Sequence, residues 1–258
     1  MVKSILSSMT LLLLIATLGF TRAGTGDYKV VTVRKGENID KLAQRYLKST
    51  RFKSDLLRYN HLKASQIRPG LRIKIPYSIS KEMAAKVKFL KGIVYRKTRN
   101  APWRTIRRSG SILLQNDTIK TGRNGMLELR FEDGSDLKIF KNSSISLQEY
   151  KYSKSGRKVN IRIHKGGLFA NVSKLKKGSR FHVSTVSAVV GVRGTSFYVS
   201  VSPRRVTKVE VYKGSVTVTA SRKRIELLAG YETTVERGKQ PRKPRKIKIP
   251  RKIQWLGR

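Results

Sequence analysis

Few residues in this sequence have a type and spacing that could perform catalysis. The chain contains no cysteine, and its three histidines are His61, His164 and His182. They are too far apart in the sequence to have the spacing of metal ligands. There is no phosphate-binding glycine loop and no serine in a G-x-S-x-G context. A carboxylate pair for glycoside hydrolysis stays open, although no spacing motivates one. We therefore predict a non-enzymatic protein without a metal or cofactor.

A cluster of acids occurs in MLELRFEDGSDLKIF (residues 126–140), where Glu132, Asp133 and Asp136 could suggest a cation site. A metal loop needs more oxygen ligands at defined spacing, so a turn is the better interpretation. Asp133 and Gly134 would make this turn between two strands of a hairpin. The apolar residues that would face inward are Leu127, Leu129, Phe131, Leu137 and Ile139.

Arg193 is a second candidate, because Gly191 and Gly194 bracket it in VVGVRGTSFYVSV (residues 189–201). The apolar residues before it are Val190 and Val192, and those after it are Phe197, Val199 and Val201. These two groups fall out of step with period two, which predicts a bulge or a bend between them. The favoured interpretation of Arg193 is structural: its guanidinium would satisfy carbonyls that the corner exposes, so Arg193→Ala would lower the thermal midpoint. The alternative is a place on a partner surface.

The charge of the chain is far from balanced. Its 258 residues include 58 Lys and Arg against 15 Asp and Glu, a formal net charge of +43. Such a chain attracts polyanions. Its hydrophobic content of 38% and its alternating segments indicate a folded protein.

The first 23 residues have the pattern of a signal peptide. Lys3 precedes the apolar run LLLLIATLGF (residues 11–20), and small residues allow cleavage after Ala23. We therefore expect an exported protein of the periplasm or cell envelope. An uncleaved membrane anchor is the alternative, although the run is shorter than the roughly 20 residues that a span needs.

Residues 28–77 predict a small module with the order strand, helix, helix, strand. Val31 and Val33 alternate as in a strand, and Asn38 can cap a helix whose apolar residues follow helical spacing. A second short helix ends at Asn60, and a Pro-Gly turn precedes the closing strand. The residues that carry a likeness to a family are Tyr28, Val31, Val33, Gly36, Glu37, Asn38, Ile39, Leu42, Ala43, Tyr46, Asn60, Ile67, Pro69, Gly70 and the final IKIP. In this order and spacing the module resembles a LysM domain.

The resemblance implies a βααβ fold that binds N-acetylglucosamine chains of peptidoglycan in a shallow groove between two loops. One wall of the groove would consist of Gly36, Glu37, Asn38 and Ile39. The other would consist of Ile67, Arg68, Pro69 and Gly70. A purely structural role as turn residues is the alternative for each glycine and for Pro69.

Residues 84–238 change to period two, in short alternating runs that predict an all-β domain. The runs KGIVYRK (91–97), KGGLFANVSK (165–174) and KGSVTVTASRK (213–223) all place Lys-Gly before a strand. This repetition favours stacked hairpins, a β-roll or a solenoid-like coil over a single Greek key. The fold class predicted for the whole chain is thus a small α+β module followed by a larger all-β domain.

The segments HVSTVSAVVGVRGTSFYVSV (182–201), VEVYKGSVTV (209–218) and LLAGYETTV (227–235) give the second module a resemblance to the FecR domain. Its signature here is the structural motif Gly191, Arg193, Gly194 and Thr195. Upstream of these segments, residues that match the order of the family are Trp103, Gly110, Asp117, Thr121 and Gly122. The resemblance implies an envelope domain that contacts other proteins or polymers. A LysM-like module stands where the anti-sigma segment of signalling members would be, so transcriptional signalling is not expected.

Residues 239–258 form a basic tail without an acid, and Pro241, Pro244 and Pro250 prevent a continuous helix. We predict an extended arm. The competing function for the whole chain is polyanion binding through charge, to nucleic acid, lipopolysaccharide, anionic lipid or wall polymer. Apolar residues of the tail, Ile247, Ile249, Ile253 and Trp255, could aid contact with lipid. Export and the scattered cations argue against nucleic acid.

Overall fold

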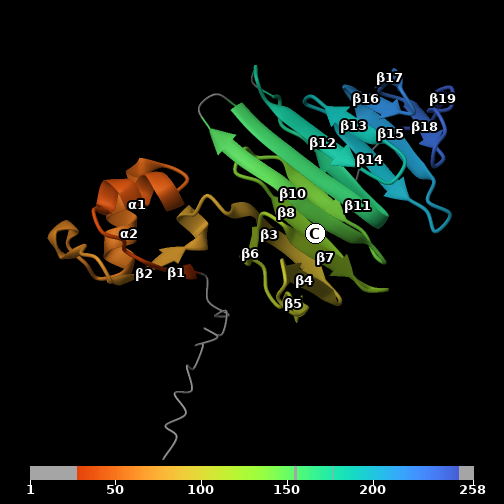
Figure 1. Cartoon of the computed structure of the whole chain (residues 1–258). Coiled ribbons are helices and arrows are strands. Elements are labelled where there is room, and N and C mark those ends of the chain that lie inside the picture. Colours follow the sequence, from red (N-terminus) through yellow and green to blue (C-terminus); the bar gives the residue numbers. More distant parts are fainter. Residues whose placement is uncertain (1–27, 154–155, 176, 250–258) are drawn as a thin grey trace, which may run out of the picture.

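The computed structural model describes residues 28–153, 156–175 and 177–249 of the chain. The predicted signal peptide (1–23) lies outside these residues, as do Ile253 and Trp255 of the tail. Within them, no helix has both the length and the apolar character needed to span a bilayer. The described chain forms a small N-terminal module with helices and a large β domain (Figure 1). The predicted order, a small mixed module and then an all-β domain, is confirmed.

The N-terminal module contains β1 (Tyr28–Thr32), α1 (Ile39–Tyr46), α2 (Lys53–Tyr59) and β2 (Arg72–Pro76), with short 3-10 turns at Thr50–Phe52 and Ala64–Gln66. β1 and β2 pair antiparallel. Their inward side chains and those of the helices form a core of Val33, Leu42, Ala43, Leu47, Leu56, Ile73, Ile75 and Ile79. Burial of these apolar groups is the main stabilising contribution in so small a unit.

Two asparagines fix the helices of this module. The side chain of Asn38 caps α1 by accepting a hydrogen bond from the Lys41 amide at 3.0 Å, as predicted. Asn60, at the end of α2, donates to the carbonyls of Leu56 and Lys74 and accepts from the Lys74 amide at 2.8 Å. Asn60 therefore fastens α2 to β2 by satisfying backbone groups of both elements.

The β domain is one network of 17 strands that folds into two sheets. Sheet I contains, in order, β6 (Ile112–Leu114), β3 (Met83–Lys91), β8 (Met126–Arg130), β9 (Asp136–Ile139), the second part of β11 (Gly156–Asn171), β14 (Ser196–Val201), β15 (Thr207–Lys213), β18 (Tyr231–Val235) and β19 (Arg245–Lys246). Sheet II contains β5 (Arg104–Thr105), β4 (Val94–Thr98), β7 (Asp117–Thr121), β10 (Ser144–Ser153), the first part of β11, β12 (Arg180–Ser184), β13 (Val189–Val192), β16 (Ser215–Ala220) and β17 (Lys223–Leu228). From β12 onward the chain changes sheet after every second strand. A short 3-10 turn, Tyr77–Ile79, leads into this domain.

The Lys-Gly repeat marks passages between the sheets. Gly92 lies between β3 and β4, Gly166 lies where β11 leaves sheet II for sheet I, and Gly214 lies between β15 and β16. All three have a positive φ, at 64°, 80° and 78°. Residues other than glycine rarely adopt this backbone conformation, which explains why the repeat recurs where the chain turns from one sheet into the other.

The phase change in residues 189–201 has the same origin. β13 belongs to sheet II and β14 to sheet I, so Val190 and Phe197 both point into the core from opposite sides. Each is fully buried. A register shift between Ser196 and Phe197 adds a bulge at the start of β14. The predicted bend and bulge are confirmed.

The predicted hairpin at residues 126–140 is also confirmed. β8 and β9 pair with Leu129 opposite Leu137. Asp133 accepts a hydrogen bond from the Ser135 amide at 3.0 Å in the turn, and Gly134 has a φ of 82°. The five apolar residues predicted to face inward are buried.

The two modules are in contact. The linker returns to α1 through an isolated bridge between Leu47 and Ser80, with the Lys48 amide donating to the Ile79 carbonyl at 3.0 Å. Lys48 also pairs with Glu132 in the β8–β9 turn. A second ion pair joins Lys29 of β1 to Glu82, which directly precedes β3, at 2.5 Å.

The basic tail begins as an extended segment on sheet I. β19 pairs with the edge strand β18, and the Ile247 amide donates to the Gly230 carbonyl at 2.8 Å. Glu232 of β18 accepts from Arg245 at 2.8 Å. The tail therefore covers an edge that would otherwise leave backbone groups of β18 unpaired.

Candidate glycan-binding loops

The two loops predicted to form a groove are adjacent. The first follows β1 (residues 33–38) and the second precedes β2 (residues 67–71). The Val33 amide donates to the Leu71 carbonyl and the Gly70 amide donates to the Val33 carbonyl, both at 2.9 Å. Because β1 and β2 are paired, their continuation brings the two loops side by side. The two loops that carry the predicted wall residues are therefore neighbours.

The side chains of Glu37 and Asn38 face into the module's own framework. Glu37 is buried, accepts a hydrogen bond from the Arg34 amide at 2.8 Å and pairs with Arg45 at 2.6 Å. Asn38 is occupied as the cap of α1. These two residues can contribute backbone groups to a ligand, while their side chains hold the shape of the loop.

Gly36 and Gly70 leave the surface of the loops open. Both have a positive φ, at 75° and 86°, and no described atom lies within 4 Å of the position that a β-carbon would occupy. Glycine is favoured there by its backbone conformation, and the same choice keeps the space above each loop clear. Lys41 donates to the Gly36 carbonyl at 2.8 Å and so fixes the first loop against α1.

The remaining predicted wall residues divide into two kinds. Ile39 and Ile67 are half-buried and pack against the module's core. Arg68 and Pro69 are exposed. The loops therefore offer a small apolar patch, backbone donors and acceptors, and one arginine, which suits a neutral acetamido sugar better than a large hydrophobic ligand.

The corner motif of the β domain is held by Thr195 and not by Arg193. Thr195 is buried, and its hydroxyl donates to the Ser215 carbonyl at 2.7 Å. Gly194 has a φ of 69°, and Gly191 lies in β13 opposite His182. Arg193 is exposed and makes no hydrogen bond or ion pair with any described residue. The expectation that its guanidinium satisfies carbonyls of the corner is wrong, because it is the Thr195 hydroxyl that donates a hydrogen bond to a carbonyl there.

An ion pair that the sequence did not indicate supports the β8–β9 turn. Arg157 of β11 is buried, pairs with Asp133 and donates to the Ser173 carbonyl at 3.1 Å. Burial lowers the pKa of Arg157 to about 10. Asp133 was expected only to make a turn, and its partner could not be found from sequence because it lies two strands further along the chain.

The histidines and acids form no metal centre among residues 28–249 as far as these are described. His164 exchanges a hydrogen bond with Ser146 at 2.8 Å, and His182 lies on β12. Burial, together with nearby Arg162, lowers the pKa of His164; burial and Arg180 do the same for His182. Both imidazoles are therefore neutral at neutral pH.

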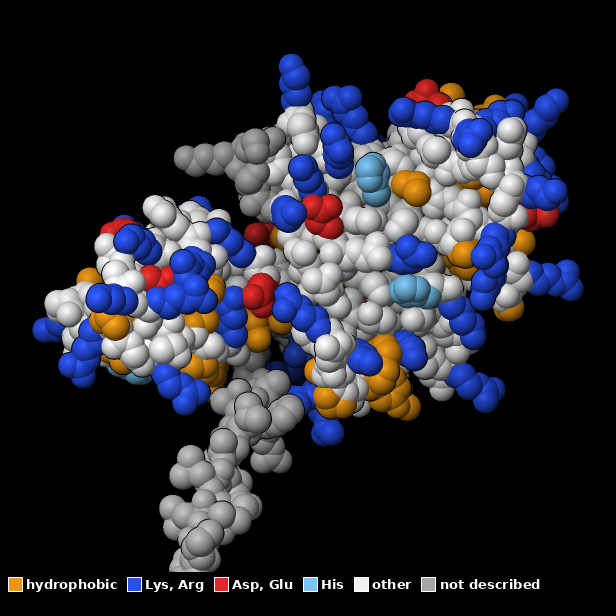
Figure 2. All heavy atoms as spheres, viewed as in Figure 1, with side chains coloured by type: hydrophobic (Ala, Val, Ile, Leu, Met, Phe, Trp, Pro, Cys, Tyr) orange, Lys and Arg blue, Asp and Glu red, His pale blue; other side chains and the backbone are white. Residues whose placement is uncertain are grey.

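Cations cover both modules on the face shown in Figure 2, without gathering into one stripe. In the N-terminal module several are paired, such as Lys53 with Asp40 at 2.7 Å and Arg58 with Asp55 at 2.6 Å. The scarcity of acids leaves most others facing solvent. This distribution favours weak attraction to any polyanion over recognition of a particular one.

Comparison with known proteins gives two family matches. Residues 31–76 match the LysM domain family, and residues 117–217 match the family described as FecR protein. The chain therefore carries a LysM domain followed by a FecR domain. No curated protein matches it.

Two crystal structures of a candidate anti-sigma factor from Parabacteroides distasonis ATCC 8503, at 2.50 and 1.65 Å resolution, are similar to part of the chain. Their TM-scores are 0.44 and 0.43, at 19% and 21% sequence identity. Each match covers 51% of this chain and 60% of the other. The chain thus spans about three fifths of the length of the structures it resembles.

Proposed function

We propose that this chain, with its LysM domain followed by a FecR domain, is a non-catalytic protein of the cell envelope that binds N-acetylglucosamine glycan of peptidoglycan. Binding would occur at the two loops of the module at residues 28–77. The β domain at residues 84–238 would be held near the wall and present a surface to a protein or polymer partner, with residues 239–258 as a basic tail. The predicted signal peptide supports export to the periplasm.

The observation that carries this proposal is the pair of hydrogen bonds between Val33 and the second loop. Val33 bonds both Leu71 and Gly70, so backbone hydrogen bonds fasten the base of one loop to the other. A shallow groove for a flexible polysaccharide needs such preorganised walls, because ordering the loops on binding would cost affinity. The clear space above Gly36 and Gly70 supports access for a chain of sugars.

The test is a pull-down of the mature chain with purified peptidoglycan from which anionic polymers have been stripped. Arg68→Ala removes an exposed side chain from the proposed groove. Lys74→Ala removes an exposed cation of β2 and serves as the charge-matched control. Asn38→Ser retains a capping oxygen and the backbone groups of the loop, so it serves as a second control within the loop itself. Circular dichroism checks that each variant is folded.

We expect wild type, Lys74→Ala and Asn38→Ser to be retained at moderate and high salt, and Arg68→Ala to be retained more weakly. Soluble chito-oligosaccharide should compete for the wild type. If retention disappears with salt and is equal in all four proteins, charge alone binds the wall and the groove has no part. Release of soluble fragments from the peptidoglycan would contradict the non-catalytic role.

Polyanion binding is the second candidate, and the excess of cations over both modules favours it. It would appear as binding to lipopolysaccharide, anionic lipid or nucleic acid whose affinity falls steeply with salt. A change of the same size for Arg68→Ala and Lys74→Ala would support this function. A difference between them would support the groove.

A further inference from the structure

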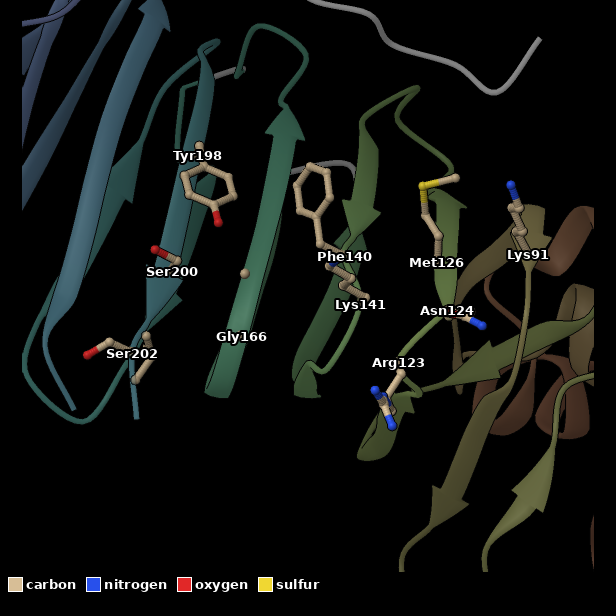
Figure 3. A pocket seen from close by; sticks show the side chains of 13 residues that line it. Lys91, Arg123, Asn124, Met126, Phe140, Lys141, Gly166, Tyr198, Ser200 and Ser202 are labelled. Carbon is tan, nitrogen blue, oxygen red and sulfur yellow. The ribbon is translucent and has the colours of Figure 1, made fainter. Parts of the chain in front are cut away.

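A hollow of about 900 Å³ lies on sheet I, away from the LysM loops. Figure 3 shows it at one end of the sheet, where Tyr198 and Phe140 stand on either side of the strand that carries Gly166. The size falls within the range of ligand pockets, roughly 300 to 1,000 Å³. Tyr198 and Ser200 alternate with the buried Phe197 and Val199, so the hollow is on the outer face of the sheet.

The two glycines of the Lys-Gly-Gly segment in β11 line the hollow. A β-carbon on Gly167 would lie 2.5 Å from the Tyr198 hydroxyl, and one on Gly166 would lie 2.2 Å from the Ser143 hydroxyl oxygen. Neither position can accept a side chain without displacing a neighbour. The Tyr198 ring occupies the space beside Gly167, and Ser143 occupies the space beside Gly166, so the two glycines let these neighbours pack directly against β11.

The wall beside these glycines is aromatic. The rings of Phe140 and Tyr198 meet edge to face, with centroids 5.7 Å apart. They come from segments on opposite sides of β11, and the missing side chain at Gly167 allows them to meet. Met126 adds another apolar surface, and Ser200 and Ser202 add hydroxyl groups. Apolar ring faces next to hydroxyls match the two kinds of surface on a sugar, its C–H face and its hydroxyl edge.

The rim of the hollow carries three exposed cations, Lys91, Arg123 and Lys141. None of them forms an ion pair with a described residue, and no described residue lining the hollow is acidic. Some cations elsewhere on sheet I are paired with acids: Lys138 with Glu128 at 3.5 Å, and Lys208 with Glu232 at 2.8 Å. Three cations without an acidic neighbour on one rim are complementary to an anionic ligand.

The sheet around the hollow has no free edge. β11 pairs with both β9 and β14, and β14 pairs with β15. A peptide could not bind there by adding a strand, the mode that supplies backbone hydrogen bonds in many peptide complexes. The contacts on offer are rings, hydroxyls and cations.

We propose that this hollow binds an acidic saccharide, with a carboxylate held by Arg123 and Lys141 and a sugar ring set against Phe140 and Tyr198. An arginine fork and a lysine suit a carboxylate as charge-assisted partners. The site lies in a different module from the LysM loops and does not depend on their binding of neutral glycan.

The test is isothermal titration calorimetry of the mature chain with tri-galacturonic acid at moderate salt. Neutral maltotriose and inorganic tripolyphosphate serve as the uncharged and the sugar-free probes. The pocket variants are Arg123→Ser with Lys141→Ser, and Ser200→Phe, which fills the hollow and keeps every charge. The charge-matched control is Lys223→Ser with Lys243→Ser, two exposed cations that do not line the hollow.

We expect tri-galacturonic acid to bind the wild type and the control alike, and both pocket variants to lose about tenfold or more in affinity. Titration of chito-oligosaccharide into the same proteins reports the LysM loops separately and should be unchanged by all of these substitutions. The proposal is overturned if tri-galacturonic acid gives no binding, or if Ser200→Phe binds as well as wild type. Equal affinity for tripolyphosphate or for maltotriose would also overturn it.

Discussion

The hydroxyl of Thr195 donates a 2.7 Å hydrogen bond to the backbone carbonyl of Ser215, 20 residues further along the chain. Thr195 lies where the chain passes from β13 in sheet II to β14 in sheet I, and Ser215 begins β16 after the chain has passed back. One side-chain bond therefore joins two consecutive passages between the sheets. Because Thr195 is buried, its hydroxyl has no water as a substitute partner.

We predict that Thr195→Val lowers the stability of the β domain by about 1 to 2 kcal/mol, because valine has nearly the same shape but cannot donate to Ser215. Chemical denaturation followed by circular dichroism measures the change. Thr195→Ser keeps the hydroxyl and should retain most of the bond.

The matched comparison is Arg193→Ala, two residues earlier. Its side chain is exposed and without a described partner, so we now expect a change within about 0.5 kcal/mol, in contrast to the expectation from sequence. A loss for Arg193→Ala as large as that for Thr195→Val would show that the arginine supports the corner after all.

Gly166→Ala should be strongly destabilising, by about 3 kcal/mol or more. Its φ of 80° strains any other residue, and the new β-carbon would meet Ser143 at 2.2 Å from the hydroxyl oxygen and 2.6 Å from the α-carbon. Gly238→Ala in the same domain has a similar φ of 74° with no described atom within 4 Å, so its cost should be about 1 to 2 kcal/mol. Urea unfolding of the two variants separates the backbone strain, which both share, from the steric clash with Ser143, which only Gly166→Ala has. Equal urea midpoints would contradict the close contact with Ser143.

The sequence predicted the elements of both modules better than their pairing. Alternation identified the strands, and the phase change after Val192 predicted a bend, because side-chain direction is a local property of a strand. It could not reveal that the bend leads to a second sheet. β11 pairs with β14 and β13 with β16, and such pairings depend on tertiary packing of segments far apart in the chain.

In the candidate sites, too, the sequence predicted local features but not three-dimensional contacts. The loop residues from Gly36 to Gly70 could be named because turn glycines, a helix cap and a Pro-Gly pair occur in a recognisable order. The inward direction of Glu37 could not, since it depends on Arg34 and Arg45 in three dimensions. The hollow on sheet I left only one trace in the sequence, the second glycine of Lys165-Gly166-Gly167.

Glu232→Gln should reduce stability in a pH-dependent way. Hydrogen bonds from Lys208 and, more weakly, Arg245 hold the pKa of the Glu232 carboxyl below its ordinary value, against the opposing effect of burial. A depressed carboxyl pKa contributes stability above the carboxyl pKa of the unfolded chain, and that contribution is lost as the pH falls through the folded pKa. The stability difference between wild type and Glu232→Gln should thus be constant above about pH 5 and shrink below about pH 4.

Urea unfolding across this pH range measures the difference, and hydrogen exchange at Lys246 and Ile247 reports whether β19 loosens at the same time. A difference that stays the same at every pH would mean that the glutamine disturbs packing and that the charge of Glu232 has no role.

Replacing Glu82 and Glu132 together by glutamine should loosen the two modules without unfolding either. These residues supply the ion pairs to Lys29 and Lys48, and exposed or partly exposed pairs contribute about 1 kcal/mol or less. We expect unchanged thermal midpoints and a broader distribution of inter-module distances by small-angle scattering. High salt on the wild type should act in the same direction. An unaltered scattering profile would show that the backbone contacts of Leu47 and Lys48 with the linker suffice to set the orientation.

The 16 residues of β11 belong to both sheets of the β domain, first beside β10 and β12 and then between β9 and β14. Because one continuous strand is hydrogen-bonded into both sheets, the sheets cannot slide past each other unless pairings of β11 break. Under tension, such as a wall-bound protein would experience during cell growth, this domain should come apart from its outer strands inward and lose its shared central strand last.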